Sequence, residues 1–189
     1  MATQDVLLVA GTQILFNDSA TYAPATALSD IEAAATSDVQ MDINAVATAG
    51  AWGSVKADLG ATRAPEYMVT AAIELQATPT TGATVDFYWA ASVVATTGTG
   101  NPGYVAGTDA AYTGTPATLA EGLAQLMFIG SLVCSADAAI QVANIGVFAP
   151  PTRYGVLIMV NNSGATTAAD AIETAIAFDP IIPQIQAAV

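Results

Sequence analysis

Carboxylates are the only side chains present in number that could carry out acid–base chemistry in this sequence. The 189 residues include sixteen Asp and Glu, three Lys and Arg, one Cys and no His, which gives a formal net charge of −13. Glu74 and Asp86 lie on consecutive candidate strands, and two carboxyl groups facing each other are what glycoside hydrolysis requires. Both, however, alternate with apolar neighbours, as solvent-facing strand positions do. Without an imidazole base, we expect no catalytic residue and predict that the chain is not an enzyme.

Metal and cofactor sites are equally weakly indicated. Asp38, Asp42 and Asn44 offer oxygen ligands, but the turn glycine and the closing glutamate of a calcium loop are missing. The glycine-rich segment 98–103 is followed by neither a lysine nor a helix signal, so it does not match a phosphate-binding loop. Cys134 stands in an apolar run, where a buried free thiol is expected. We therefore predict no metal site and no cofactor.

The three basic residues are informative because they are so few. Arg63 and Arg153 each precede a candidate strand, and in an acidic chain each guanidinium is expected to find a carboxylate. For Arg153 the pattern favours an internal clamp that fixes a loop to a sheet. Arg63 fits either a clamp or a contact between subunits. Lys56 is expected to be an ordinary solvated strand residue.

Charge also limits the partners. The negative field of the chain repels nucleic acid and anionic membranes, and no apolar run reaches the roughly 18 residues of a membrane-spanning helix. Charged residues make up only 10% of the chain, against about a quarter in typical soluble domains. Such a surface suits a subunit that packs against neighbours, so we predict a homo-oligomer that binds neither nucleic acid nor membrane.

The hydrophobic pattern predicts an all-β fold. Alternating apolar residues, such as Val85, Phe87 and Trp89, recur between turn signals. Nine candidate strands cover residues 6–16, 39–43, 52–59, 67–75, 84–92, 126–133, 140–147, 155–161 and 174–178. This number of short strands indicates a two-sheet antiparallel β-sandwich of the jelly-roll kind. We expect residues 46–189 to form the sandwich and residues 1–45 to form a partly extended N-terminal arm that packs on the same domain or on a neighbouring subunit.

Two features interrupt the strand pattern. Capping-box spacings at Ser29–Glu32 and Thr118–Glu121 predict at most two short helices. Residues 96–118 read as a long Gly/Thr-rich loop, and long loops in compact β domains often bind a partner. Aromatic side chains in or near this loop are candidates for interface contacts or for stacking on a sugar: Trp52, Tyr104 and Tyr112.

The second half of the chain, over roughly residues 66–183, resembles a known class of proteins. The resemblance rests on these segments in order: Val85–Ser92, the loop with Tyr104, Gly107, Asp109 and Tyr112, Leu126–Gly130, Arg153–Gly155 and Val160–Gly164. These segments are similar to those of small virion structural proteins of tailed bacteriophages, such as head decoration (cement) proteins.

The resemblance implies a non-enzymatic β-sandwich that lies on the outer surface of the capsid. There it would bridge subunits of the major capsid protein and associate with itself, most often as a trimer. The residues proposed for these contacts are Arg63, Arg153, Tyr104, Tyr112 and Trp52. Two alternatives stay open: a structural protein associated with the tail, neck or fibre, and a carbohydrate-binding module that contacts a host surface glycan.

Overall fold

The structure is a computed structural model that describes residues 11–27, 29–136, 140–170 and 172–182. Strands make up most of its regular secondary structure. The strands of these residues are β1 (Gln13–Asn17), β2 (Thr36–Gln40), β3 (Gly50–Gly53), β4 (Ala57–Asp58), β5 (Glu66–Ile73), β6 (Thr84–Ser92), β7 (Ala110–Ala111), β8 (Met127–Val133), β9 (Gln141–Phe148), β10 (Tyr154–Asn162) and β11 (Ala175–Ile181). A short 3-10 helix, η1 (Pro102–Tyr104), and a short α-helix, α1 (Leu119–Leu123), complete the set. Each expected strand overlaps an observed one, but three differences stand out. The strand expected at 6–16 is seen only from Gln13, with residues 6–10 outside the described residues; the one expected at 52–59 is split into β3 and β4; and β7 is not among the expected strands.

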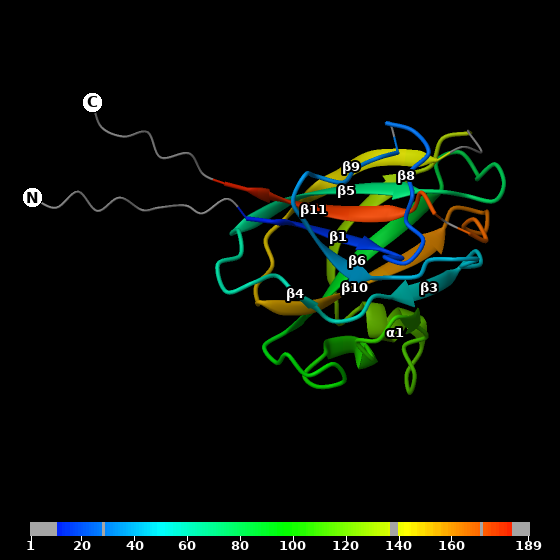
Figure 1. The fold of residues 1–189 in the computed structure, drawn as a ribbon. Coiled ribbons are helices and arrows are strands. Elements are labelled where there is room, and N and C mark those ends of the chain that lie inside the picture. The colour runs from blue at the N-terminus through cyan, green and yellow to red at the C-terminus, as the bar shows by residue number, and fades with distance from the viewer. Residues whose placement is uncertain (1–10, 28, 137–139, 171, 183–189) are drawn as a thin grey trace, which may run out of the picture.

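The strands form two sheets that pack as a sandwich (Figure 1). One sheet has the order β2-β1-β11-β5-β9, and the other has the order β7-β3-β10-β6-β8, with β4 also paired to β10. All pairings are antiparallel except that of β1 with β2, which is parallel. The predicted all-β sandwich is therefore confirmed, and its strand order is compatible with a jelly roll.

The N-terminal part of the described chain belongs to the sandwich. β1 lies between β2 and β11 in the first sheet, and Ile14, Phe16, Val39 and Met41 are buried in the main core. Residues 13–45 thus pack on the same domain, one of the two placements expected for the N-terminal arm, and they supply apolar side chains to its core. Residues 1–10 lie outside the described residues.

The core between the sheets is built around Trp89. Its ring centroid lies 5.7 Å from that of Phe148 and 5.7 Å from that of Phe178, and Phe16 lies 6.3 Å away in an edge-on arrangement. Val85 and Phe87 are buried on the same face of β6, as the alternation predicts. Opposite the indole is Gly155 of β10, where a Cβ atom would overlap the ring. Glycine is thus required for the two strands to close around Trp89.

One of the two capping boxes starts a helix and the other does not. At α1, the Glu121 N–H donates to Thr118 Oγ1 (3.3 Å) and the Thr118 N–H donates to Glu121 Oε2 (3.0 Å). The predicted helix at residues 29–32 is wrong. There the Ser29 hydroxyl donates to Glu173 (2.9 Å) instead of capping. Gln13 of β1 binds the backbone at Ile31 and Ala33, so tertiary contacts override the local signal.

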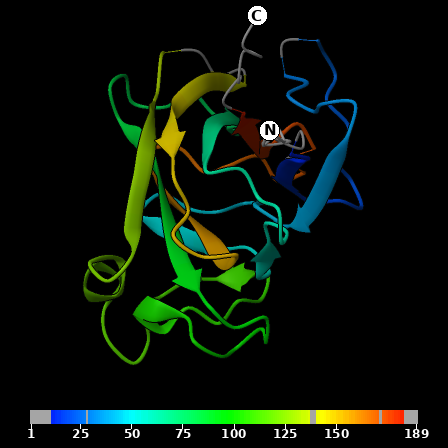
Figure 2. The ribbon, with the colours of Figure 1, turned by 90° about the vertical axis from the view of Figure 1, so that its left-hand side faces the viewer.

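The connection from β6 to β8, residues 93–126, forms a lobe on the outer face of the second sheet. It contains η1, β7 and α1, and its residues Val105 and Tyr112 pack on Ala90, Val156 and Ile158 of the sheet. Figure 2 shows this green segment gathered at one end of the sandwich. The expected loop is therefore an ordered layer that covers part of the sheet.

Candidate functional site

Lys56 organises the start of the lobe. Its Nζ donates to Ser92 Oγ (3.1 Å) and to the backbone oxygens of Val94 (3.0 Å), Thr96 (2.7 Å) and Thr99 (2.7 Å). Partial burial lowers the pKa of Lys56, while four oxygens favour the ammonium form that can donate to them. The expectation of a solvated strand residue is therefore wrong, because the ammonium holds together a loop with few apolar side chains.

Asp109 fixes the far side of the lobe to the sandwich. Its Oδ1 accepts from Trp52 Nε1 (2.6 Å) and from the Asp42 N–H (2.8 Å), and its Oδ2 accepts from Gln40 Nε2 (3.2 Å). The half-buried Trp52 packs against the main core. Its ring is thus held within the protein rather than presented to a partner.

The two tyrosines of the lobe have different environments. Tyr112 is only 7% exposed, and its hydroxyl donates to the Gly103 carbonyl (2.5 Å). Tyr104 is 50% exposed and adopts a left-handed backbone with φ +61°. Both border a cavity of about 210 Å³ between the lobe, β3 and β10. Of the three predicted aromatic contact residues, only Tyr104 offers an open ring.

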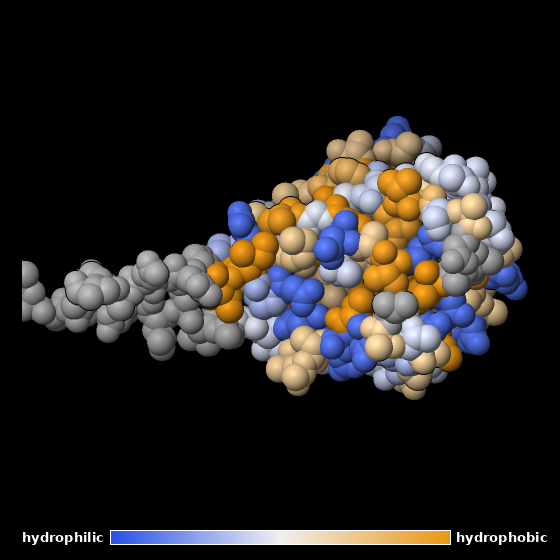
Figure 3. Space-filling view, turned by 90° about the horizontal axis from the view of Figure 1, so that it is seen from above, coloured by the Kyte–Doolittle hydropathy of each residue, from blue (hydrophilic) through white to orange (hydrophobic). Residues whose placement is uncertain are grey.

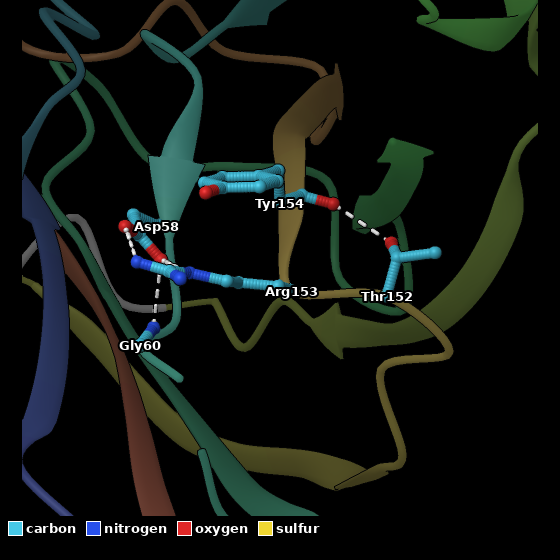
Figure 4. A network of polar contacts seen from close by, with 5 residues as sticks. All are labelled: Asp58, Gly60, Thr152, Arg153 and Tyr154. Carbon is cyan, nitrogen blue, oxygen red and sulfur yellow. Dashed lines mark hydrogen bonds and ion pairs between the residues drawn. The ribbon is translucent and has the colours of Figure 1, made fainter. Parts of the chain in front are cut away.

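Arg153 forms the expected internal clamp (Figure 4). Its Nε donates to Asp58 Oδ1 and its second guanidinium nitrogen to Asp58 Oδ2, both at 2.6 Å. The guanidinium carbon also lies 5.0 Å from the centre of the Tyr154 ring. The Gly60 N–H donates to the same carboxylate (2.9 Å). The hydrogen bond from Arg153 holds the pKa of Asp58 below its usual value of 3.8.

The clamp leads to a pH-dependent prediction. A carboxyl group whose pKa is lowered by folding stabilises the protein above its unfolded pKa, and this contribution is lost as the pH falls through the folded pKa. The pair is exposed, so Asp58→Asn is expected to lower the free energy of unfolding by about 0.5 kcal/mol at neutral pH. Urea denaturation should show this difference shrinking below about pH 4. If the difference in the free energy of unfolding between wild type and Asp58→Asn stays constant until the carboxyl is fully protonated, the prediction is contradicted.

Arg63 is placed differently from Arg153. It lines a second cavity of about 280 Å³, together with Asp58, Gly60 and Tyr67. Within the described part of the chain, Arg153–Asp58 is the ion pair that forms, and Arg63 has no such partner. The guanidinium of Arg63 is thus available to a carboxylate from outside, and its role between subunits stays a prediction.

The carboxylates considered for chemistry do not come together. Asp86 is in β6 of the second sheet, where it accepts from Ser131 (2.6 Å) and Asn162 (2.8 Å). Glu74 follows β5 of the other sheet, and burial raises the pKa of its carboxyl. Asp42 accepts from the Asn44 N–H (3.1 Å) within a turn. In the described ranges, no group of three or more His, Cys, Asp or Glu is arranged to hold a metal.

A strip of exposed hydrophobic side chains follows β8 and β9, the edge strands of the two sheets. The strands meet where Gly130 approaches the backbone of Ile145. Among the described residues, five of the seven exposed large hydrophobic side chains lie on these strands, so the clustering is not general to the described surface. We call them the β8–β9 strip: Met127, Phe128, Val133, Val142 and Val147.

The charge pattern sets the β8–β9 strip apart from the rest of this acidic chain. Neither β8 nor β9 contains a charged residue. Figure 3 views the molecule from above, the side on which β9 lies, and shows hydrophobic areas in a broken band between polar ones. The two strands are therefore uncharged along their own length, and the carboxylate of Asp86 borders them where it accepts from Ser131 of β8 (2.6 Å).

Two of these features escaped prediction from sequence. Lys56 carried one available signal, since it is the one lysine of the sequence and a polar segment without acidic side chains, residues 92–101, follows later in the chain. The β8–β9 strip carried another, since two apolar strands lack the polar alternation that an exposed face requires. Cys134 is buried as expected, and burial raises the pKa of its thiol.

Comparison with known proteins adds no relative. No protein-family model matches the chain, and no curated protein matches it. Among the described residues, no helix is long and apolar enough to cross a membrane. The function must therefore be argued from the surfaces just described.

Proposed function

We propose that this chain is a non-enzymatic virion structural protein of a tailed bacteriophage, a head decoration protein that binds the outside of the capsid. There it bridges subunits of the major capsid protein and stabilises the shell. The observation that carries the proposal is the uncharged β8–β9 strip on an otherwise acidic sandwich. A binding surface of this kind suits an assembly component, and the resemblance of residues 66–183 to phage virion proteins supports the same role.

The strip is assigned to contacts between copies of the chain. Two molecules that each carry a net charge of −13 repel one another, so they must meet where carboxylates are absent. β8 and β9 carry no carboxylate of their own, with Asp86 at the border of β8, and they offer apolar area for burial, with Val133 63% exposed and Phe128 57% exposed. A trimer is the favoured assembly. Contact with the shell would then use the acidic surface, matched to basic patches on the major capsid protein.

The cementing role is tested on particles that lack the protein. When the purified full chain is added, it should bind at many sites over the shell. The particles should then release their DNA at a higher temperature. Binding should weaken with added salt, because it joins an acidic surface to basic patches. Equal heat resistance with and without bound protein would reject the cementing role.

The role of the strip is tested by Val133→Asp. A carboxylate buried at a contact between copies is costly, so this variant is expected to associate at least tenfold more weakly, an energy of about 1.4 kcal/mol. Sedimentation velocity measures the change. Val93→Asp is the matched control, because Val93 is 79% exposed but lies in the lobe. If Val133→Asp leaves association unchanged, or if the wild-type chain stays monomeric, the strip does not mediate contacts between copies.

The position on the particle separates the proposal from a role in the tail, neck or fibre. Gold-labelled antibody should mark the whole shell if the protein decorates the capsid. Labelling confined to one vertex or to the tail would replace the decoration role with the alternative, even if copies associate through the strip.

A further inference from the structure

The cavity beneath the lobe has an unusual lining for a protein so rich in carboxylates. Its volume is about 210 Å³. None of its lining residues is charged. The polar groups come from Tyr104, Thr108, Thr113 and Thr115 and from the backbone of the glycine-rich loop. An ion would find no opposite charge here, whereas a small neutral molecule with hydroxyl groups would find partners.

Tyr104 gives the cavity an aromatic wall. A tyrosine in the left-handed region is strained, and such conformations persist only where the surrounding structure enforces them. Here Gly103 is buried against Gly122 and Leu126, and its carbonyl is held by the Tyr112 hydroxyl. The backbone of Tyr104 is thus fixed at the border of the cavity, while half of the residue's surface stays open.

The cavity lining also includes a pair of hydroxyl groups that could bind a ligand. Thr113 Oγ1 and Thr115 Oγ1 lie 2.8 Å apart, and both residues are exposed. Their mutual hydrogen bond uses one of two O–H groups, so the pair retains one donor and further acceptor lone pairs for a ligand. The lobe that carries them is anchored by Lys56 and Asp109. The site is therefore already shaped before a ligand arrives, which reduces the entropy lost on binding.

We propose that this cavity binds one neutral sugar ring of a glycan. The apolar C–H face of the ring stacks on Tyr104, and its hydroxyl groups exchange hydrogen bonds with Thr113 and Thr115. A sugar is favoured over an aromatic metabolite because the lining is rich in hydroxyl and backbone groups, and over an anion because it contains no cation. This site is independent of the β8–β9 strip and would add glycan attachment to a structural role.

Saturation-transfer NMR on the full chain tests the site with glucose, galactose, mannose, N-acetylglucosamine and their β-linked disaccharides. At least one should give a saturable signal at millimolar concentration, strongest on the C–H protons of one ring face. Tyr104→Gly, which removes the ring and suits the left-handed backbone, is expected to weaken binding about tenfold. Tyr104→Phe should bind within about threefold of wild type because the ring remains.

Tyr154→Ala is the matched control, since it removes a tyrosine that faces Arg153 and lies outside the cavity. If Tyr104→Gly unfolds, amide shifts decide instead: in the wild-type protein the sugar should move the resonances of residues 104–115 and leave those of β8 and β9 in place. The absence of saturable binding by every sugar named, binding unaffected by loss of the Tyr104 ring, or shifts located elsewhere would each overturn the proposal.

Discussion

Replacing Lys56 with methionine is expected to loosen the lobe and to lower the free energy of unfolding by about 2 kcal/mol. Hydrogen bonds to a charged group stabilise more than neutral ones, and the loss leaves the carbonyls of Val94, Thr96 and Thr99 with only their neutral donors, the Ser92 hydroxyl and the Thr99 N–H. Methionine keeps most of the length and apolar stem of lysine, so the effect isolates the ammonium. Because the segment has little apolar surface to replace these bonds, we expect local opening to precede global unfolding.

Hydrogen exchange measured by mass spectrometry checks this result. Peptides covering residues 92–101 should exchange at least tenfold faster in Lys56→Met, while peptides from β5 and β11 should change little. Arg153→Met serves as the matched control: it also removes one positive charge, taking the net charge from −13 to −14, but from a clamp outside the lobe. Equal protection of residues 92–101 in Lys56→Met and wild type would show that the ammonium does not hold the loop.

Gly155→Ala is expected to destabilise the protein strongly, by about 3 kcal/mol. The added Cβ would overlap the Trp89 indole, and the indole cannot move away because Phe16, Phe148 and Phe178 surround it. Relief requires either a shift of β10 relative to β6 or a strained rotamer of Trp89. Chemical denaturation followed by tryptophan fluorescence measures the loss.

Two further variants give this prediction its controls. Gly98→Ala adds the same methyl group where the nearest atom would be 3.9 Å away, so its effect should stay within about 0.5 kcal/mol. Trp89→Phe makes room for the methyl group, and the double variant should therefore be less destabilised than the sum of its single changes. Additive losses would mean that Gly155 and Trp89 act independently.

The elements were predictable because their signals are local. Alternation in Thr84–Ser92 marks β6 over its full length, and the Thr118–Glu121 spacing marks the start of α1. The identical spacing at Ser29–Glu32 failed because Gln13 and Glu173, remote in sequence, take the groups that a helix would use. Strand order and the parallel pairing of β1 with β2 are likewise fixed by contacts between distant segments.

The candidate sites were less predictable for the same reason. The clamp of Arg153 could be anticipated from the scarcity of cations, but its partner Asp58 could not, since the two are 95 positions apart. Trp52 and Tyr112 were attractive as aromatic residues near a loop, yet Asp109 and the Gly103 carbonyl engage them internally. The role of Lys56 could not be predicted because its four acceptors are a serine hydroxyl and backbone carbonyls, and such oxygens occur in any Ser/Thr-rich loop.

The central place of β11 in the first sheet sets the order in which the protein can be completed during synthesis. Ile14 of β1 pairs with Phe178 of β11, and β11 also joins β1 to β5. Until β11 leaves the ribosome, β1 and β2 have no strand that connects them to β5 and β9. Such distant pairing slows folding because a long loop must close first. Nascent chains are therefore expected to wait with this sheet in two separate pairs, β1–β2 and β5–β9, until β11 emerges and joins them.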